Sequence, residues 1–404
     1  MKKEKLLNNS ILITLIALIL FLPLSAWLIS LTGNRYISLT RDGLIFISVL
    51  LALLKIKKWH WNVNLILLLS FILFATLTYF WKDSSTIQWL KGWRFVLGPI
   101  LLTVASTQFK FSQRAKNIIL WVLLISGIAV TFVAVLELIG INIPLGSTMF
   151  DVGGLDQIHT VEGLGSHRLQ SILAGPNALG LFMLAQSILG LTVYPKIIKY
   201  GWLSLILFIP ILFFTFSRSS LIALVIVLIA WLINLFIHSS QKVRIAQIMA
   251  VIVTTFFICG WWFNDAIDWR GFLLHGTSTE LRMEQYQRIW DSKYDIGLLG
   301  RGAGTAGPSS QYRLDNGSNH WTENIYLDLF EEYGLIGISL YLLLTGSILV
   351  ELLKRSRDEL NKSALLALIG FAVAGLFINY YTGQVGIFMY WIIISLALQK
   401  VKEG

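Results

Sequence analysis

The sequence predicts an all-α integral membrane protein, and three observations lead to that fold class. Hydrophobic residues make up 56% of the 404-residue chain and charged residues only 13%, which is not the composition of an ordinary soluble protein. Apolar runs long enough to cross roughly 30 Å of hydrocarbon recur along nearly the whole length. These runs lack the strict alternation of barrel strands, so they predict helices, whose backbone polar groups are satisfied internally.

The apolar runs predict about twelve transmembrane helices. The first is long for the apolar part of a signal peptide, so we expect it to remain in the protein as an uncleaved helix. We find no sustained repeat and expect residues 1–404 to form a single polytopic membrane domain. The predicted cores span residues 11–31, 37–54, 63–80, 87–105, 118–139, 177–194, 202–216, 221–237, 245–263, 334–353, 364–381 and 385–398.

The net charge of +10 invites a nucleic-acid partner, but the distribution of the basic residues favours a membrane topology instead. If the N-terminus is cytoplasmic and the helices alternate, more than half of the 32 Lys and Arg residues fall in cytoplasmic segments. This positive-inside bias predicts that both termini are cytoplasmic. We therefore expect no nucleic-acid partner.

Two loops are much longer than the others. Because successive helices cross the membrane in opposite directions, both loops are expected on the outer face. Residues 141–176 form one outer loop, and residues 264–333 form a large extracytoplasmic loop between the ninth and tenth helices. Within the large loop, residues 277–280 match a capping box and should begin an amphipathic helix. A second amphipathic helix is expected over about 323–333, with Gly334 at its C-terminal end. Both should lie near the membrane interface.

Arg218 follows a tight turn between the seventh and eighth expected helices, among Ser217, Ser219 and Ser220. A charge at or just below the membrane surface is costly and points to a function. A guanidinium among hydroxyls suits a phosphate bound bidentately. The alternative is an arginine that snorkels to the lipid headgroups.

Three more basic residues are expected near the same face. Arg168 precedes the start of the sixth helix, and an arginine beside a helix N-terminus favours an anion. Lys91 and Arg94 lie in the outer half of the fourth helix. Together with Arg218 they predict a basic ring at the outer surface, although Lys91 alone could equally snorkel.

His320 and Glu323 are the candidate catalytic bases, next to the second amphipathic helix. An unperturbed histidine titrates near neutrality and needs little tuning to act as a base. A carboxylate at a helix N-terminus is stabilised as the anion, so Glu323 could instead orient an acceptor hydroxyl. Glu137, near the outer end of the fifth helix, could pair with an arginine or serve the acceptor site.

The sequence predicts neither a metal site nor a cofactor. Residues 302–307 match the pattern G-x-G-x-x-G, but no βαβ unit is expected around them, so we expect no nucleotide. The single cysteine, Cys259, lies in a predicted helix and offers no thiolate metal site.

Several motifs now resemble one family, the O-antigen ligases and polysaccharide polymerases, which are multi-pass bacterial membrane glycosyltransferases. The order and spacing of these motifs carry the resemblance, and the topology is similar along about the whole chain. The motifs are Arg168 with Gly175-Pro176-Asn177, Thr215-Phe216-Ser217-Arg218, Arg282 with Trp290, Gly300-Arg301-Gly302, and Asn324-x-Tyr326-Leu327 followed by Glu332-x-Gly334-x-x-Gly337.

The resemblance implies a GT-C-like fold, a donor and an acceptor that are oligosaccharides linked to polyprenyl diphosphate, and no metal or nucleotide. It implies that arginines hold the donor diphosphate and that a loop base serves the acceptor. The residues expected to bind the diphosphate are Arg168, Arg218, Arg94, Lys91 and Arg282. The expected catalytic residues are Glu323 and His320, and those expected to position the acceptor are Asn324, Tyr326 and Glu137.

The chain departs from the family pattern at one position. Ligases carry His immediately before the Asn-x-Tyr-Leu element, whereas this chain has Glu323 there and His320 three residues earlier. We therefore expect an inverting polymerase at the outer face of the bacterial cytoplasmic membrane, working with a flippase and a chain-length regulator on a polymer such as capsule, exopolysaccharide or O-antigen. The alternatives are a ligase for another acceptor and a flippase, although a flippase would have basic residues along a central cavity.

Overall fold

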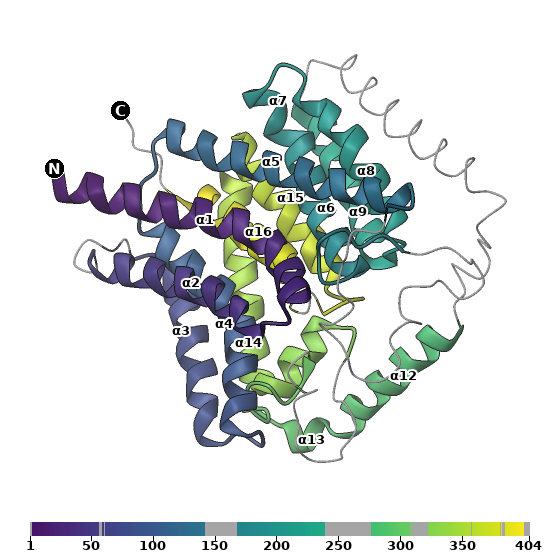
Figure 1. Ribbon diagram of the computed structural model, residues 1–404. Coiled ribbons are helices and arrows are strands. Elements are labelled where there is room, and N and C mark those ends of the chain that lie inside the picture. The colour runs from purple at the N-terminus through teal and green to yellow at the C-terminus, as the bar shows by residue number, and fades with distance from the viewer. Residues whose placement is uncertain are drawn as a thin grey trace.

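The computed structural model describes residues 2–55, 59, 61–141, 168–238, 276–307, 310, 322–356, 358–379, 381 and 384–399, and these residues form helices and no strands (Figure 1). The helices are α1 (Lys2–Thr32), η1 (Arg35–Ile37), α2 (Ser38–Leu53), α3 (Val63–Leu77), η3 (Thr78–Phe80), α4 (Thr86–Thr107), α5 (Gln113–Leu138), α6 (Pro176–Thr192), α7 (Tyr194–Ile197), η6 (Gly201–Leu203), α8 (Ser204–Phe214), α9 (Arg218–His238), α12 (Gly276–Asp291), α13 (Lys293–Ile296), α14 (Ile325–Lys354), α15 (Glu359–Ala374) and α16 (Val385–Leu398).

The all-helical class is confirmed for the described residues, and the expected apolar segments there coincide with helices. The expected segment 245–263 lies outside them. In the described part of the chain, five helices are long and apolar enough to cross a membrane, so this is a multi-pass membrane protein. The count of about twelve remains a prediction. The five are Leu6–Thr32, Val63–Phe80, Gln113–Leu138, Arg218–Leu235 and Ile325–Lys354.

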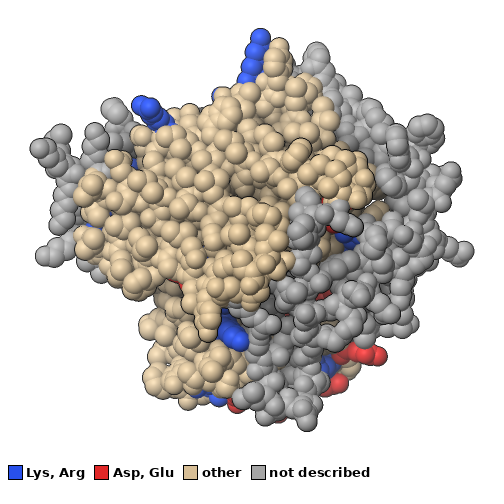
Figure 2. Space-filling view, viewed as in Figure 1, with Lys and Arg blue, Asp and Glu red and all other residues tan. Residues whose placement is uncertain are grey.

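The surface seen in Figure 2 agrees with this interpretation. A broad area of the described residues is uncharged, and most of the visible Lys and Arg side chains lie at its margins. Acidic side chains gather at the lower right, where Figure 1 places α12 and α13. An uncharged belt with charges at its edges is the surface that a bilayer selects.

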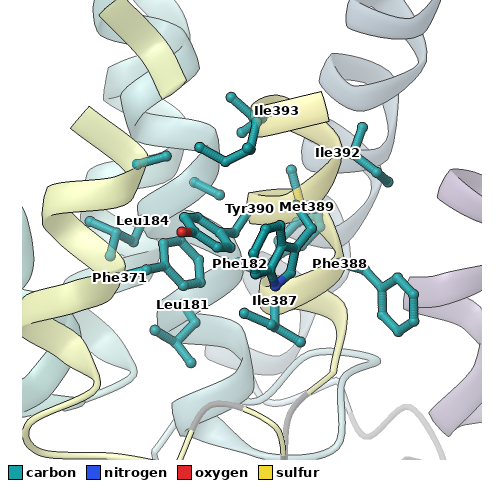
Figure 3. Close-up of a cluster of buried hydrophobic side chains, with 14 of the residues drawn as sticks. Leu181, Phe182, Leu184, Phe371, Ile387, Phe388, Met389, Tyr390, Ile392 and Ile393 are labelled. Atoms are coloured by element: carbon teal, nitrogen blue, oxygen red, sulfur yellow. The ribbon is translucent and has the colours of Figure 1, made fainter. Parts of the chain in front are cut away.

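Helix α16 is the centre of the bundle. All of its residues from Val385 to Leu398 are buried, and it packs against α4, α6 and α15. Figure 3 shows its aromatic side chains among those of α6 and α15, where Tyr390 stacks on Phe371 with ring centroids 4.9 Å apart. A helix that is apolar on every side is stable only when it is covered on every side. Helix α16 therefore separates α2 and α4 from α6 and α9 (Figure 1).

Helix α14 consists of two segments that meet at a kink. Gly334 has φ 63° and ψ −166° inside the helix, so the segment 325–333 ends there and a second segment continues to Lys354. This confirms the expected helix end at Gly334. The neighbouring chain lies very close, since a Cβ on Gly334 would be 2.4 Å from the Gly300 backbone nitrogen. Only glycine suits both the positive φ and this approach.

The acidic side of the first α14 segment is buried. Asp328 and Glu332 are 3% and 4% exposed, and Glu331 is fully buried. Glu331 pairs with Arg288 and Arg301, each at 3.4 Å. The sequence predicts an amphipathic helix here. Its polar side contacts protein instead of water, because the loop at 300–307 packs onto it.

That loop contains the G-x-G-x-x-G pattern, and packing explains its glycines. The Gly304 backbone nitrogen donates to Glu332 Oε1 at 2.8 Å. Gly304 has φ 83°, and a Cβ there would lie 2.3 Å from the Gln88 carbonyl oxygen of α4. The loop thus fastens the start of α14 to the start of α4.

Candidate active site

An ion pair between Arg282 and Glu323 forms the centre of the candidate site. Arg282 lies on α12, and Glu323 immediately precedes Asn324, the N-cap residue of α14. Arg282 Nε donates to Glu323 Oε2 at 2.6 Å, and Nη2 contacts the same oxygen. Both side chains remain partly exposed, at 23% and 39%. The structure therefore joins two residues that the sequence assigned to different roles, diphosphate binding and catalysis.

Arg168 is held between two helix ends. Its Nε donates to the Thr215 carbonyl oxygen at 2.9 Å, and its Nη2 donates to Asn177 Oδ1 at 2.8 Å. Thr215 lies in the turn between α8 and α9, and Asn177 lies in the first turn of α6. The arginine, the Pro-Asn helix start and the Thr-Phe-Ser-Arg turn are thus one structural unit.

Arg218 begins α9 and lies within electrostatic reach of Arg282 and Glu323. Burial lowers the pKa of Arg168 to about 10. The nearby charge of Glu323 acts to raise this pKa, and that of Arg218 acts to lower it. A guanidinium with that pKa is charged at neutral pH. Three arginines and one glutamate therefore share one region, whose formal charge of +2 suits a dianionic ligand.

The serines around Arg218 contact one another. Ser217 Oγ lies 3.1 Å from the hydroxyls of both Ser219 and Ser220, and all three serines are buried. Ser217 and Ser220 also pack against Gly180 of α6, where a Cβ would lie 2.7 Å from Ser220 Oγ. They position Arg218 by fixing the start of α9 against α6.

A buried network fixes the segment that contains Glu323. Asp328 Oδ1 accepts hydrogen bonds from the Thr322 backbone nitrogen at 3.2 Å and from Thr322 Oγ1 at 2.7 Å. Its other oxygen accepts from Asn379 Nδ2. Sequence analysis did not assign Asp328 a role at the site. The sequence signal for Asp328 is a carboxylate four residues, about one helical turn, after Asn324.

Asn324 and Tyr326, expected to position the acceptor, make their polar contacts with helix ends. Asn324 Oδ1 accepts from the Tyr326 backbone nitrogen at 3.0 Å, and its Nδ2 donates to the Leu376 carbonyl oxygen at 3.2 Å. Tyr326 OH donates to the Ala372 carbonyl oxygen at 2.9 Å. These residues anchor the start of α14 to the end of α15, so an effect on an acceptor would be indirect.

The remaining candidates lie elsewhere or outside the described residues. Glu137 accepts from the backbone nitrogens of Gln170 and Ser171, the latter at 2.8 Å, and so holds the segment after Arg168. Arg94 pairs with Asp42 of α2 at 2.9 Å, and Lys91 precedes it by one turn of α4. His320 lies outside the described residues. Among the side chains that the structure describes, no group of His, Cys, Asp and Glu could hold a metal ion.

Comparison with known proteins supports the family that the motifs resemble. Residues 203–342 match the family model described as O-antigen ligase. This match supports the resemblance to the O-antigen ligase and polymerase family that the motifs indicated. The matched stretch includes Arg218, Arg282 and Glu323 but not Arg168 or Arg94. No curated protein matches the chain. The family supports an enzyme of the O-antigen ligase and polymerase type that acts on a lipid-linked polysaccharide.

Proposed function

We propose that the protein polymerises, or transfers en bloc, oligosaccharide repeat units linked to polyprenyl diphosphate, at the outer face of the cytoplasmic membrane. The observation that carries the proposal is the convergence of Arg168, Arg218 and Arg282 on Glu323. Arginines bind a diphosphate through paired, charge-assisted hydrogen bonds. Their combined charge would also stabilise the charge that builds on the leaving group.

In the proposed reaction, an acceptor sugar hydroxyl attacks the anomeric carbon of the donor. The new glycosidic bond forms as the bond from the anomeric carbon to the diphosphate oxygen breaks, with inversion. Polyprenyl diphosphate leaves with the bonding electrons, and Glu323 or His320 takes the hydroxyl proton. The diphosphate is held by arginines and needs no metal ion.

Arg282 connects donor binding to the acceptor side in this proposal. In the structure it pairs with Glu323, and a carboxylate accepts a hydrogen bond from a sugar hydroxyl. A bound diphosphate would compete for Arg282 and leave more of the Glu323 carboxylate for the acceptor. Orientation of the hydroxyl by a carboxylate is worth several orders of magnitude in rate even without strong base catalysis.

The departure from the family pattern at Glu323 favours polymerisation over ligation to another acceptor. The proposal includes an inner-membrane location, both termini in the cytoplasm, the loops 141–176 and 264–333 on the outer side, and a flippase and chain-length regulator as partners. The product would be a cell-surface polysaccharide such as capsule, exopolysaccharide or O-antigen.

The test uses purified full-length protein in liposomes with lipid-linked repeat units and no energy source. Elongation by the wild type is expected, together with a loss of roughly 100-fold in Arg218→Ala, because a charge-assisted contact in the transition state contributes about 2–3 kcal/mol. Arg355→Ala is the matched control, since Arg355 lies at the other end of α14 and pairs with Glu351 at 2.8 Å. Lipid movement across the membrane without elongation would favour a flippase, and full activity in Arg218→Ala would refute the diphosphate role.

A further inference from the structure

A second cluster of arginines lies where α2 and α4 meet. Asp42 of α2 accepts from Arg41 Nη2 at 2.7 Å and Nε at 3.0 Å, and its other oxygen accepts from Arg94 Nη1 at 2.9 Å. Arg41 is 8% exposed, and its guanidinium lies over the ring of Phe388 in the first turn of α16, 5.9 Å from the centroid. Two arginines thus share one carboxylate.

The cluster has more positive charge and donor capacity than its own contacts use. Asp42 balances one of the two guanidinium charges, so a formal charge of +1 remains. Arg94 Nε is buried and has no hydrogen-bond partner among the described residues. The side chains of Arg94 and Asp42 are nonetheless 27% and 22% exposed, so the cluster is accessible from one side. A buried donor left unsatisfied is costly and is normally explained by a ligand or a function.

The cluster lies on the same side of the protein as the candidate active site. Asp83, just before α4, donates from its backbone nitrogen to the Arg301 carbonyl oxygen at 2.8 Å. Gln88 Nε2, in the first turn of α4, donates to the Gly304 carbonyl oxygen at 2.7 Å. The loop at 301–304 also donates hydrogen bonds to the first segment of α14, from Arg301 N to the Glu331 carbonyl oxygen and from Gly304 N to Glu332 Oε1.

A small cavity lies between α4 and this part of α14. Phe95 of α4, the neighbour of Arg94, lines it opposite Asp328, together with Asn379. Asp328 holds Thr322, which precedes Glu323. The helix that carries Arg94 is therefore separated from the catalytic segment by one layer of side chains.

We propose that Arg41 and Arg94 form a second anion subsite, which binds the phosphate groups of the lipid-linked acceptor. This inference rests on the proposed function, because a polymerase uses two lipid-linked substrates. The attacking hydroxyl of the acceptor is separated from its own diphosphate by a repeat unit, so that diphosphate must bind away from the donor site. Helices α4 and α6 pack on opposite sides of α16, and two helix spacings of roughly 8–10 Å each give such a separation.

Asp42 has a defined role in this subsite. Before the acceptor binds, it holds both guanidiniums in place and offsets part of their charge. A phosphate that arrives competes with Asp42 for the same donors and also reaches Arg94 Nε. The opposing interpretation is a structural ion triad that only fastens α2 to α4, in which each of the three residues matters equally.

The experiment compares two acceptors with a fixed donor, using the purified full-length protein. One acceptor is a single repeat unit on polyprenyl diphosphate, and the other is the same unit on a neutral alkyl chain. The wild type is expected to prefer the diphosphate acceptor by roughly 10- to 100-fold in kcat/KM, the effect of one or two charge-assisted contacts. Arg94→Gln and Arg41→Gln should abolish the preference while keeping turnover of the neutral acceptor, and Arg94→Lys should keep part of it.

Asp42→Asn separates the two interpretations because it removes the competing carboxylate and leaves both arginines. The subsite predicts an equal or greater preference for the diphosphate acceptor in this variant, whereas a structural triad predicts a loss like that of Arg94→Gln. The inference is overturned if Arg94→Gln slows both acceptors equally, or if Asp42→Asn matches it. The loss of roughly 100-fold expected for Arg218→Ala with both acceptors tests the proposed function separately.

Discussion

Asp328 offers a sharp test of how the Glu323 segment is held. Replacing it with Ala removes the acceptor for three donors: the Thr322 backbone nitrogen at 3.2 Å, Thr322 Oγ1 at 2.7 Å and Asn379 Nδ2. Asp328 is only 3% exposed, so water cannot easily replace its carboxyl group as a hydrogen-bond acceptor. A hydrogen bond contributes about 0.5–1.5 kcal/mol, so the loss of three is enough to release Thr322 and the neighbouring Glu323.

We expect the consequence in catalysis rather than in donor binding. A displacement of about 1 Å at a catalytic group costs on the order of 100-fold in rate. The hydrogen bonds of Arg168 go to Thr215 and Asn177, and that of Arg282 goes to Glu323. Asp328→Ala should therefore lower kcat by roughly 100-fold with little change in the donor KM. Asp328→Asn, which keeps the shape and one acceptor oxygen, should lie between the wild type and Asp328→Ala.

The assay is initial-rate elongation of a lipid-linked repeat unit by purified protein at equal folded concentration. Asp295→Asn is the matched control, since Asp295 is an exposed carboxylate on α13 in the same loop region. An unchanged kcat in a well-folded Asp328→Ala protein would refute the positioning role. A rise in donor KM at unchanged kcat would show that Asp328 acts on the donor site instead.

Two further predictions concern Glu323 and the kink of α14. Glu323→Gln should cut polymerisation severely and His320→Ala only partly, measured as polymer ladders at equal membrane abundance; full activity in Glu323→Gln would contradict the proposed mechanism. Gly334→Ala should lower the thermal unfolding temperature, because φ 63° costs a side chain about 1–2 kcal/mol and its Cβ would meet backbone at 2.4 Å. Gly346→Ala on the same helix meets nothing within 4 Å and should leave the unfolding temperature unchanged or slightly raised; equal effects of the two glycine substitutions would contradict the reasoning.

The helices were predictable because a segment that crosses a membrane must be apolar over a sufficient length and must satisfy its own backbone hydrogen bonds. Apolar length and the absence of alternation placed the segments, and local chemistry placed several boundaries. Asn62 caps α3 by accepting from the Leu65 backbone nitrogen at 2.8 Å, Pro176 begins α6, and Gly334 ends the first segment of α14. These signals act within one turn of helix, so they can be read without knowledge of the tertiary structure.

The partners of the charged residues were not predictable in the same way. The sequence analysis assigned both Arg94 and Arg282 to diphosphate binding, whereas the structure pairs Arg94 with Asp42 and Arg282 with Glu323. These pairs join residues 52 and 41 positions apart in the chain, a separation at which spacing carries no information about contact. Arg41 was overlooked, although an Arg-Asp pair inside the expected apolar segment 37–54 is itself a signal.

The buried acids of α14 show how the start of this helix is fixed next to Glu323. The segment 325–333 buries Asp328, Glu331 and Glu332 beside apolar side chains, so apolar packing alone does not fix it. Backbone donors of the Gly-rich loop instead fix this segment: Arg301 and Gly302 donate to the carbonyl oxygens of Glu331 and Glu332 at 2.9 Å each. Directional hydrogen bonds of this kind fix both the rotation of the segment about its axis and its position along that axis, which apolar packing alone does not. Because the same segment begins beside Glu323, the glycines that allow the loop to approach α4 determine the geometry at the site.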